Sequence, residues 1–299
     1  MEKISITFLG TGNAVPTKKR NHTSILLSYK NENILIDCGE GTQRQFRFAE
    51  ISPTKLTRIL ITHWHGDHIL GLPGLLQTLA MSEYKKVLQI AGPKNTLKYL
   101  ELISHLAIKN HVQIKAKEFS SGTVFESDEI RISCLPMSHG APSLAYSFEI
   151  KEKRRLDKNK LKKLKLPNSP LLKKLAEGKD IVIDNKKIKS SSVSYIEKGR
   201  KITFILDTAP NANTIKLAKN SDILISEASF SNEEEKLASE YLHLTAKQAA
   251  EIAKKAKCKS LILTHISQRY ENSPEVILKE AKAVFKNTSL AFDLQKFEI

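Results

Sequence analysis

The stretch His63-Trp64-His65-Gly66-Asp67-His68 decides the fold, because it places four side chains that commonly bind metal ions within six residues. It directly follows the apolar run RILIT at residues 58–62, which predicts a short buried strand. Side chains two positions apart on an extended chain point to the same face, so His63 and His65 can act together. The turn through Gly66 can bring Asp67 and His68 round as a second set. Imidazole and carboxylate ligands of this kind suit Zn²⁺ or Mn²⁺.

Three more residues of ligand type each follow an apolar run, and they are His139, Asp207 and His265. Open α/β sheets place their sites at the carboxyl ends of strands, which is where all three are expected. Taken singly, each has an ordinary alternative, such as a turn cap for Asp207. Taken together with the first motif, they complete seven ligands, which is enough for two metal ions.

Short apolar strands alternate with helices along the remaining chain, which predicts an α/β fold built in layers. Strands are expected near residues 3–9, 22–38 (as the two runs HTSILLSY and NILIDCG), 58–62, 87–91, 112–119, 129–135, 144–150, 201–206, 222–226, 261–264 and 289–298. Helices are expected near residues 42–49, 68–81, 93–108, 211–219, 245–256 and 274–286. We therefore expect a single domain over residues 1–299 that one insertion interrupts.

Positive charge is concentrated in that insertion. The chain carries 48 Lys or Arg against 32 Asp or Glu, a net charge of +16. Residues 151–190 hold 15 Lys or Arg and 5 Asp or Glu, so +10 of that total lies in 40 residues. Such a composition cannot bury much core, so we expect a protruding arm and not a second domain, with a short amphipathic helix near residues 160–166. Its charge favours an anionic partner, above all a nucleic acid.

Cysteine usage and hydropathy indicate the compartment. The three cysteines form no CxxC pair, and a sparse, odd set fits a reducing cytoplasm. No apolar run approaches the roughly 20 residues that a membrane helix needs. Residues 1–8 alternate like a strand and lack the layout of a signal peptide. We therefore expect a cytoplasmic protein without a membrane partner.

The ordered set HxHxDH, His139, Asp207 and His265 resembles the metallo-β-lactamase superfamily. The resemblance implies a four-layer αβ/βα sandwich that holds two Zn²⁺ ions per chain, with Mn²⁺ as the alternative. It also assigns the ligands to three sets. One metal takes His63, His65 and His139, the other takes Asp67, His68 and His265, and Asp207 bridges both.

Motifs along nearly the whole chain resemble the tRNase Z family more narrowly than the superfamily. They are FLGTG at residues 8–12, PTKKRN at 16–21, LIDCGEGTQRQ at 35–45, DHILGLPGLL at 67–76, LDTAP at 206–210, HLTA at 243–246 and THISQRY at 264–270. The resemblance implies a zinc-dependent endoribonuclease whose partner is precursor tRNA. Such an enzyme removes the 3′ trailer, leaving a 3′-hydroxyl on the tRNA and a 5′-phosphate on the trailer.

The same resemblance implies three catalytic residues. Asp67 is the expected general base, and His243, supported by Glu227, is the expected acid that protonates the leaving 3′ oxygen. The family often has His-Glu-Ala-Thr around this glutamate, whereas here the sequence is Ser226-Glu227-Ala228-Ser229. We therefore carry over Glu227 alone from this motif.

The resemblance further implies how substrate is held. Residues 151–197 stand where the family carries a flexible arm, the exosite that grips the tRNA elbow. Family members commonly form homodimers, so a homodimer is expected here. The candidate phosphate contacts near the site are Lys18, Lys19, Arg20, Asn21 and Arg269. The arginines rank above the lysines, because a guanidinium can hold phosphate with two hydrogen bonds.

Three other functions remain open to a chain with these ligands. A metallohydrolase of small molecules, such as a lactonase or a thioesterase, would keep the seven ligands but would not use a strongly basic arm. A β-CASP mRNA-processing enzyme would need a large inserted domain after Asp207, and the sequence has none there. An RNA-binding protein with a vestigial metal site would not need a complete ligand set.

Overall fold

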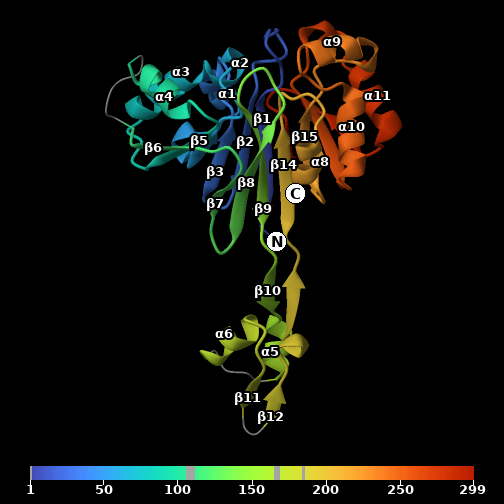
Figure 1. Cartoon of the computed structure of the whole chain (residues 1–299). Coiled ribbons are helices and arrows are strands. Elements are labelled where there is room, and N and C mark those ends of the chain that lie inside the picture. The colour runs from blue at the N-terminus through green and yellow to red at the C-terminus, as the bar shows by residue number, and fades with distance from the viewer. Residues whose placement is uncertain (1, 106–111, 165–168, 184–185) are drawn as a thin grey trace.

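The structure is a computed structural model of the chain, and it describes residues 2–105, 112–164, 169–183 and 186–299. Two seven-stranded mixed sheets face each other, and helices cover the outer face of each (Figure 1). The expected four-layer αβ/βα sandwich is therefore confirmed. Among the described residues, no helix is both long and apolar enough to span a membrane.

The first sheet comes mainly from the N-terminal half and has the strand order β18-β1-β2-β3-β4-β5-β6. Its strands are β1 (Ile4–Gly10), β2 (Ser24–Tyr29), β3 (Glu32–Ile36), β4 (Arg58–Leu60), β5 (Leu88–Gly92), β6 (Ile114–Glu118) and β18 (Lys296–Glu298). The helical elements of this half are α1 (Thr42–Phe48), η1 (Pro53–Lys55), α2 (Gly66–Ile69), α3 (Leu72–Met81) and α4 (Thr96–Ser104).

The second sheet has the order β17-β16-β15-β14-β9-β8-β7. Its strands are β7 (Gly122–Glu126), β8 (Ile130–Met137), β9 (Ser143–Ile150), β14 (Arg200–Ile205), β15 (Ile223–Glu227), β16 (Ser260–Thr264) and β17 (Thr288–Leu290). Its helical elements are α8 (Ala212–Ala218), η2 (Asn232–Glu234), α9 (Glu235–Glu240), α10 (Ala246–Lys255), η3 (Gln268–Tyr270) and α11 (Glu275–Val284).

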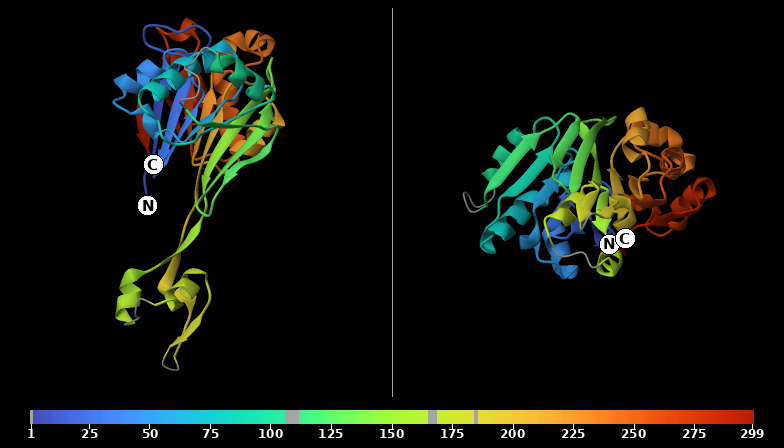
Figure 2. Two further views of the ribbon diagram at one scale, coloured as in Figure 1. Left: turned by 90° about the vertical axis from the view of Figure 1, so that its left-hand side faces the viewer. Right: turned by 90° about the horizontal axis from the view of Figure 1, so that it is seen from below.

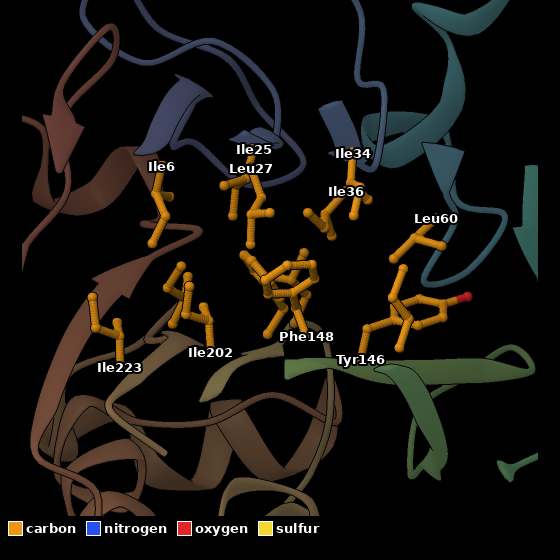
Figure 3. Close-up of a cluster of buried hydrophobic side chains, with 14 of the residues drawn as sticks. Ile6, Ile25, Leu27, Ile34, Ile36, Leu60, Tyr146, Phe148, Ile202 and Ile223 are labelled. Carbon is orange, nitrogen blue, oxygen red and sulfur yellow. The ribbon is translucent and has the colours of Figure 1, made fainter. Parts of the chain in front are cut away.

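The main core lies between the two sheets. Figure 3 shows side chains of the first sheet, such as Ile6 and Leu27, opposite Phe148 and Ile202 of the second. These residues alternate along their strands with residues that face the helices, as the period of an extended chain requires. Burial of this apolar surface stabilises the pairing of the sheets and fixes the rim where the strands end.

The two runs HTSILLSY and NILIDCG, which are expected as strands within residues 22–38, form the hairpin β2–β3, which turns at Lys30 with a positive φ of 52°. Two other expected elements are divided in the structure. The helix expected at 68–81 is α2 and α3, because Pro73 starts a new helix. The strand expected at 289–298 is β17 and β18, which belong to different sheets. The last part of the helix expected at 93–108 lies outside the described residues, and α4 ends at Ser104.

The basic insertion leaves the sandwich as a long projection (Figures 1 and 2). Its stalk is an antiparallel ribbon of β10 (Lys153–Leu156) and β13 (Ser194–Glu197). Its head consists of α5 (Lys158–Lys163), α6 (Leu171–Ala176), β11 (Ile181–Ile183), β12 (Lys186–Ile188) and α7 (Ser190–Val193). The head buries Leu175, Ile181 and Val193 in a small core of its own. The helix expected at 160–166 corresponds to α5, and residues 165–166 lie outside the described part.

Candidate metal centre

The seven side chains of the ligand pattern come together at one rim of the sandwich. The residues from 63 to 68 follow β4 and enter α2, and the other three follow β8, β14 and β16. Their ligand atoms form two groups in which all atoms lie within 4.8 Å of one another. The groups are His63, His65 and His139, and Asp67, His68, Asp207 and His265. Apart from Asp207, which falls in the second group, the members of each group are those that the resemblance assigned to each metal.

Asp207 lies between the two groups and directs one oxygen to each. Its Oδ1 is 3.3 Å from Nε2 of His68 and 3.1 Å from Nε2 of His265. Its Oδ2 is 3.7 Å from Nε2 of His63 and 3.8 Å from Nε2 of His139. A carboxylate placed in this way can bridge two cations.

Four of the five imidazoles are oriented by an oxygen at Nδ1, which leaves Nε2 toward the cluster. Asp37 Oδ2 lies 2.7 Å from Nδ1 of His68, and Ser229 Oγ lies 2.8 Å from Nδ1 of His265. Thr62 Oγ1 lies 3.1 Å from Nδ1 of His63, and the Leu242 carbonyl oxygen lies 3.2 Å from Nδ1 of His139. Hydrogen bonds of this kind fix the tautomer and the ring direction of histidines that bind metal.

The donor set fits a divalent cation. Nε2 of His68 and Nε2 of His265 are only 3.2 Å apart, and both also face oxygens of Asp67 and Asp207. The buried Oδ1 of Asp207 has no hydrogen-bond partner in the described part of the chain. Burial, together with neighbouring His68, lowers the pKa of His63 well below its ordinary value, which keeps its lone pair available. Buried carboxylates and neutral imidazoles that converge in this way are satisfied by a bound metal ion.

A histidine–glutamate pair borders the cluster. Nδ1 of His243 lies 3.0 Å from Oε2 of Glu227 and 3.9 Å from Oδ2 of Asp207. Burial alone would lower the pKa of His243, but the carboxylates of Glu227 and Asp207 outweigh it and raise the pKa to about 9. At neutral pH this imidazole therefore carries a proton that it can donate.

Local structure fixes both members of the pair. Glu227 ends β15 and is fully buried, where its Oε1 accepts from the Thr208 amide at 2.7 Å and its Oε2 from Ser229 Oγ at 2.6 Å. His243 comes two residues before Thr245, the N-cap of α10. Thr245 and Gln248 form a reciprocal capping box, which holds the chain entering the helix.

Comparison with known proteins places this site in a family. The chain is 42% identical to the ribonuclease Z of Methanothermobacter thermautotrophicus over 298 residues, covering 99% of this chain and 97% of the relative. It is 39% identical to the ribonuclease Z of Listeria welshimeri, covering 99% of both chains. The chain belongs to the ribonuclease Z family. The resemblance to tRNase Z is therefore confirmed over the whole length.

Other matches agree with this membership. The crystal structure of the short form of human tRNase Z has a TM-score of 0.72 and 25% identity, and 98% of each chain is covered. The metallo-β-lactamase fold protein YhfI from Bacillus subtilis has a TM-score of 0.73 at 19% identity and supports the fold alone. A family model described as "Anti-Pycsar protein Apyc1" matches residues 4–157, which include His63 to His139 but neither Asp207 nor His243.

Ser226, which stands where the ribonuclease Z family often has histidine, faces neither ligand group. It is buried within β15, and its Oγ donates to the backbone carbonyl of Glu227 at 3.0 Å. Glu227 is positioned by Thr208 and Ser229, so its contact with His243 does not depend on residue 226. The substitution therefore leaves the histidine–glutamate pair assembled.

Sequence reasoning missed two residues that orient ligands. Asp37 contacts His68 and also accepts from the amide and hydroxyl of Thr62 at 2.7 and 2.6 Å. Ser229 links His265 to Glu227. Asp37 follows the apolar strand β3, so the rule that found Asp207 could have found it. Ser229 had no such signal, because a serine after a strand is common.

The expected phosphate contacts differ in accessibility. Lys18 and Lys19 are exposed, and the amide of Asn21 donates to the Glu40 carbonyl at 2.8 Å. Arg20 is only 3% exposed, and its Nη1 donates to Thr11 Oγ1 at 2.7 Å and to the Ala291 carbonyl at 2.9 Å. Neighbouring segments therefore cover the guanidinium of Arg20, which leaves little of it open to a phosphate in this arrangement.

Arg269, unlike Arg20, has an exposed side chain. Its side chain is half exposed, and its guanidinium carbon lies 5.6 Å from the centre of the Phe230 ring. It follows His265 by four residues, on the segment whose residue Ile266 bridges to Gly12 of the first loop. Of Arg20 and Arg269, only Arg269 has a side chain exposed enough to contact a phosphate near the cluster.

Paired substitutions separate the two roles. We expect Arg20→Met to lower the free energy of unfolding by about 1–3 kcal/mol, because it removes two buried hydrogen bonds from a charged group. We expect Arg269→Met to leave stability nearly unchanged and to raise KM for precursor tRNA. Denaturant unfolding and steady-state kinetics of both variants provide the measurement. Equal stability of Arg20→Met and the wild type would contradict the structural role.

Proposed function

We propose that this chain is an endoribonuclease that removes the 3′ trailer from precursor tRNA, leaving a 3′-hydroxyl on the tRNA and a 5′-phosphate on the trailer. The observation that carries the proposal is the arrangement around Asp207. This carboxylate faces two ligand groups and stands 3.9 Å from His243, in a chain that is 42% identical to a ribonuclease Z over its full length.

We propose two Zn²⁺ ions per chain, with Mn²⁺ as the alternative. His63, His65 and His139 would hold one, Asp67, His68 and His265 would hold the other, and Asp207 would contact both. The chemistry that such a pair supplies is Lewis-acid activation of water and neutralisation of phosphate charge.

Asp67 is the proposed partner of the attacking water. Its Oδ2 lies 3.3 Å from Nε2 of His68 and 3.5 Å from Nε2 of His265, so it borders the second ligand group. Burial would raise the pKa of Asp67, but His68 and His265 lower it well below its ordinary value. The ionised carboxylate can therefore orient the water as a hydrogen-bond acceptor. The family resemblance, and not this pKa, is the ground for proposing that it also takes the proton as the new phosphorus–oxygen bond forms.

His243 is the proposed acid. As the bond between phosphorus and the 3′ oxygen breaks, that oxygen gains negative charge and needs a proton. His243 donates it, and the buried carboxylate of Glu227 stabilises the charged imidazole beforehand. Arg269, Lys18 and Lys19 are proposed to hold the flanking phosphates.

Substrate choice tests this function against its alternatives. We expect the zinc-loaded protein to cleave a precursor tRNA with a 3′ trailer much faster than it hydrolyses a small lactone or a thioester. Preferred hydrolysis of the lactone or the thioester would instead make the chain a small-molecule metallohydrolase. Binding of the precursor without cleavage would support an RNA-binding protein.

Residues 151–197 are proposed as an arm of one metallo-β-lactamase domain that contacts the tRNA away from the cut. Its exposed head carries Lys162, Lys163, Lys173 and Lys174 on α5 and α6. Charge of this sign, far from the cluster and on a projecting element, suits a phosphate backbone and contributes nothing to the reacting bond.

Removing the arm is expected to separate binding from chemistry. Ile150 and Arg200 are partners in the β9–β14 pair, so deletion of residues 153–197 leaves a four-residue turn between paired strands. We expect KM for precursor tRNA to rise about 10- to 100-fold and to depend less on salt. Hydrolysis of bis(p-nitrophenyl) phosphate should stay unchanged.

A charge-reversal variant is the matched control for the deletion. Lys162→Glu, Lys163→Glu and Lys174→Glu together keep the head core and reverse three exposed charges. This variant should weaken tRNA binding in the same direction. An equal loss of both activities in either variant would contradict an arm that serves binding alone.

We also propose a homodimer in the cytoplasm. Phe48, Leu70 and Met81 are exposed apolar residues in or beside α1 to α3, which suits a contact surface between copies. All three cysteines are buried and unpaired, as expected in a reducing compartment. Light scattering of the purified protein tests the dimer.

A further inference from the structure

A partly open cavity lies between the two sheets, at the edge formed by β5, β6 and β7. It has a volume of about 260 Å³. Elsewhere the space between the sheets is filled by apolar side chains, as Figure 3 shows around Phe148. Here the first sheet contributes three cationic side chains to the lining, and they are Arg58, Lys115 and Lys117. None of the seven candidate metal ligands is among the residues that line the cavity.

Arg58 places a buried positive charge in the lining of this cavity. It is only 6% exposed, and its guanidinium carbon stands 3.7 Å from the centre of the Phe125 ring. Its Nη2 lies 3.3 Å from Oε1 of Glu32, whereas its buried Nε has no partner among the described residues. Among the described residues Glu32 meets only one nitrogen of this guanidinium, so an anionic group that reached its other donors from the cavity would complete the pairing of a buried cation.

The remaining lining favours an aliphatic body over an aromatic one. Leu60, Ala91 and Val124 line the cavity and offer only methyl and methylene surface. Phe125 already carries Arg58 above its ring, and Phe119 carries Lys117 at 5.1 Å from its centre. These two ring faces are therefore occupied by cations, which leaves alkyl contact as the main apolar interaction.

We propose that this cavity binds a small amphipathic anion, a medium-chain alkyl carboxylate whose head pairs with Arg58 and whose chain lies against Leu60, Ala91 and Val124. The volume limits the length of the chain. At about 30 Å³ for each water-sized unit, the cavity holds roughly nine non-hydrogen atoms, which is close to the ten of an eight-carbon carboxylate. This binding is independent of the proposed nuclease function.

Calorimetric titration with octanoate tests the proposal on the full-length protein. We expect one site per chain with a dissociation constant of about 10–100 µM, which is ordinary for a ligand of this size. Octanol lacks the charge and acetate lacks the chain, so each should bind at least about tenfold more weakly. Octanoate that binds no better than octanol would overturn the role of the cationic wall.

Three variants locate the site. Arg58→Met keeps the length of the side chain and removes its charge, and it should weaken octanoate at least about tenfold. Ala91→Leu fills the cavity and keeps the charge of Arg58, and it should abolish binding even if Arg58→Met fails to fold. Arg131→Met removes an exposed arginine of β8 that pairs with Glu126 at 2.8 Å, and it should bind like the wild type. Undiminished binding by folded Ala91→Leu would overturn the assignment.

Discussion

Replacing Asp207 with asparagine is expected to reduce cleavage of precursor tRNA by about a thousandfold or more. The substitution keeps the shape of the side chain and removes the one negative charge that both ligand groups share. Oδ1 of Asp207 lies 3.1–3.3 Å from Nε2 of His68 and His265, and Oδ2 lies 3.7–3.8 Å from Nε2 of His63 and His139. Loss of that charge should weaken both metal sites together, and bound metal should fall from about two ions per chain to one or fewer.

Metal content and turnover are measured on the same preparations. Asp128→Asn is the matched control, because Asp128 is exposed and lies outside the cluster. This control should retain both ions and full activity. An Asp207→Asn protein that keeps two ions and normal turnover would contradict the bridging role.

Replacing His243 with glutamine is expected to slow cleavage of precursor tRNA by about 10²- to 10⁴-fold, the range typical of a lost general acid. The same variant should hydrolyse bis(p-nitrophenyl) phosphate at nearly the wild-type rate. Nitrophenolate is a good leaving group and needs no proton, whereas the ribose 3′ oxygen must be protonated as it leaves. A proportional loss on both substrates would instead show that His243 supports the metal centre and does not act as the acid.

The pH profile gives an independent test of the same pair. Because Glu227 raises the pKa of His243, the protonated acid persists through neutral pH and is lost as the pH rises. Glu227→Gln removes that carboxylate charge, so activity should decline at a lower pH than in the wild type. A decline that stays at the same pH would separate Glu227 from the proton of His243.

The sequence predicted which residues gather into the candidate metal centre, because these residues obey a local rule. Each follows a short apolar strand, and the carboxyl ends of such strands meet at one rim of an α/β sheet. The sequence alone could therefore place Asp207 and His265 near His63, although no tertiary contact between them was known. The same rule covers Asp37, which follows β3 and orients His68.

The accessibility of Arg20 could not be predicted in this way. Its burial depends on Ala291 and Asp293, which lie more than 270 residues further along the chain, and on the stacking of Phe292. The same segment carries the chain from β17 in one sheet to β18 in the other, which the apolar pattern at residues 289–298 did not reveal. Contacts this distant in sequence leave no periodic signal.

The small core of the arm was likewise hidden by its composition. Lysines dominate residues 151–190, and the burial of Leu175 against Ile181 and Val193 arises only once α6 and β11 fold back on the stalk. Sequence reasoning therefore predicted the charge of the projection but not its packing.

Mapping the cut ends of a precursor tRNA at single-nucleotide resolution is the most direct test of the central claim. Incubation with the zinc-loaded protein should yield tRNA with a free 3′-hydroxyl and a trailer that carries the 5′-phosphate, and chelation of the metal should stop the reaction. A 2′,3′-cyclic phosphate on the tRNA, or cleavage that continues without metal, would contradict a metal-activated water attacking the phosphorus with His243 protonating the 3′ oxygen.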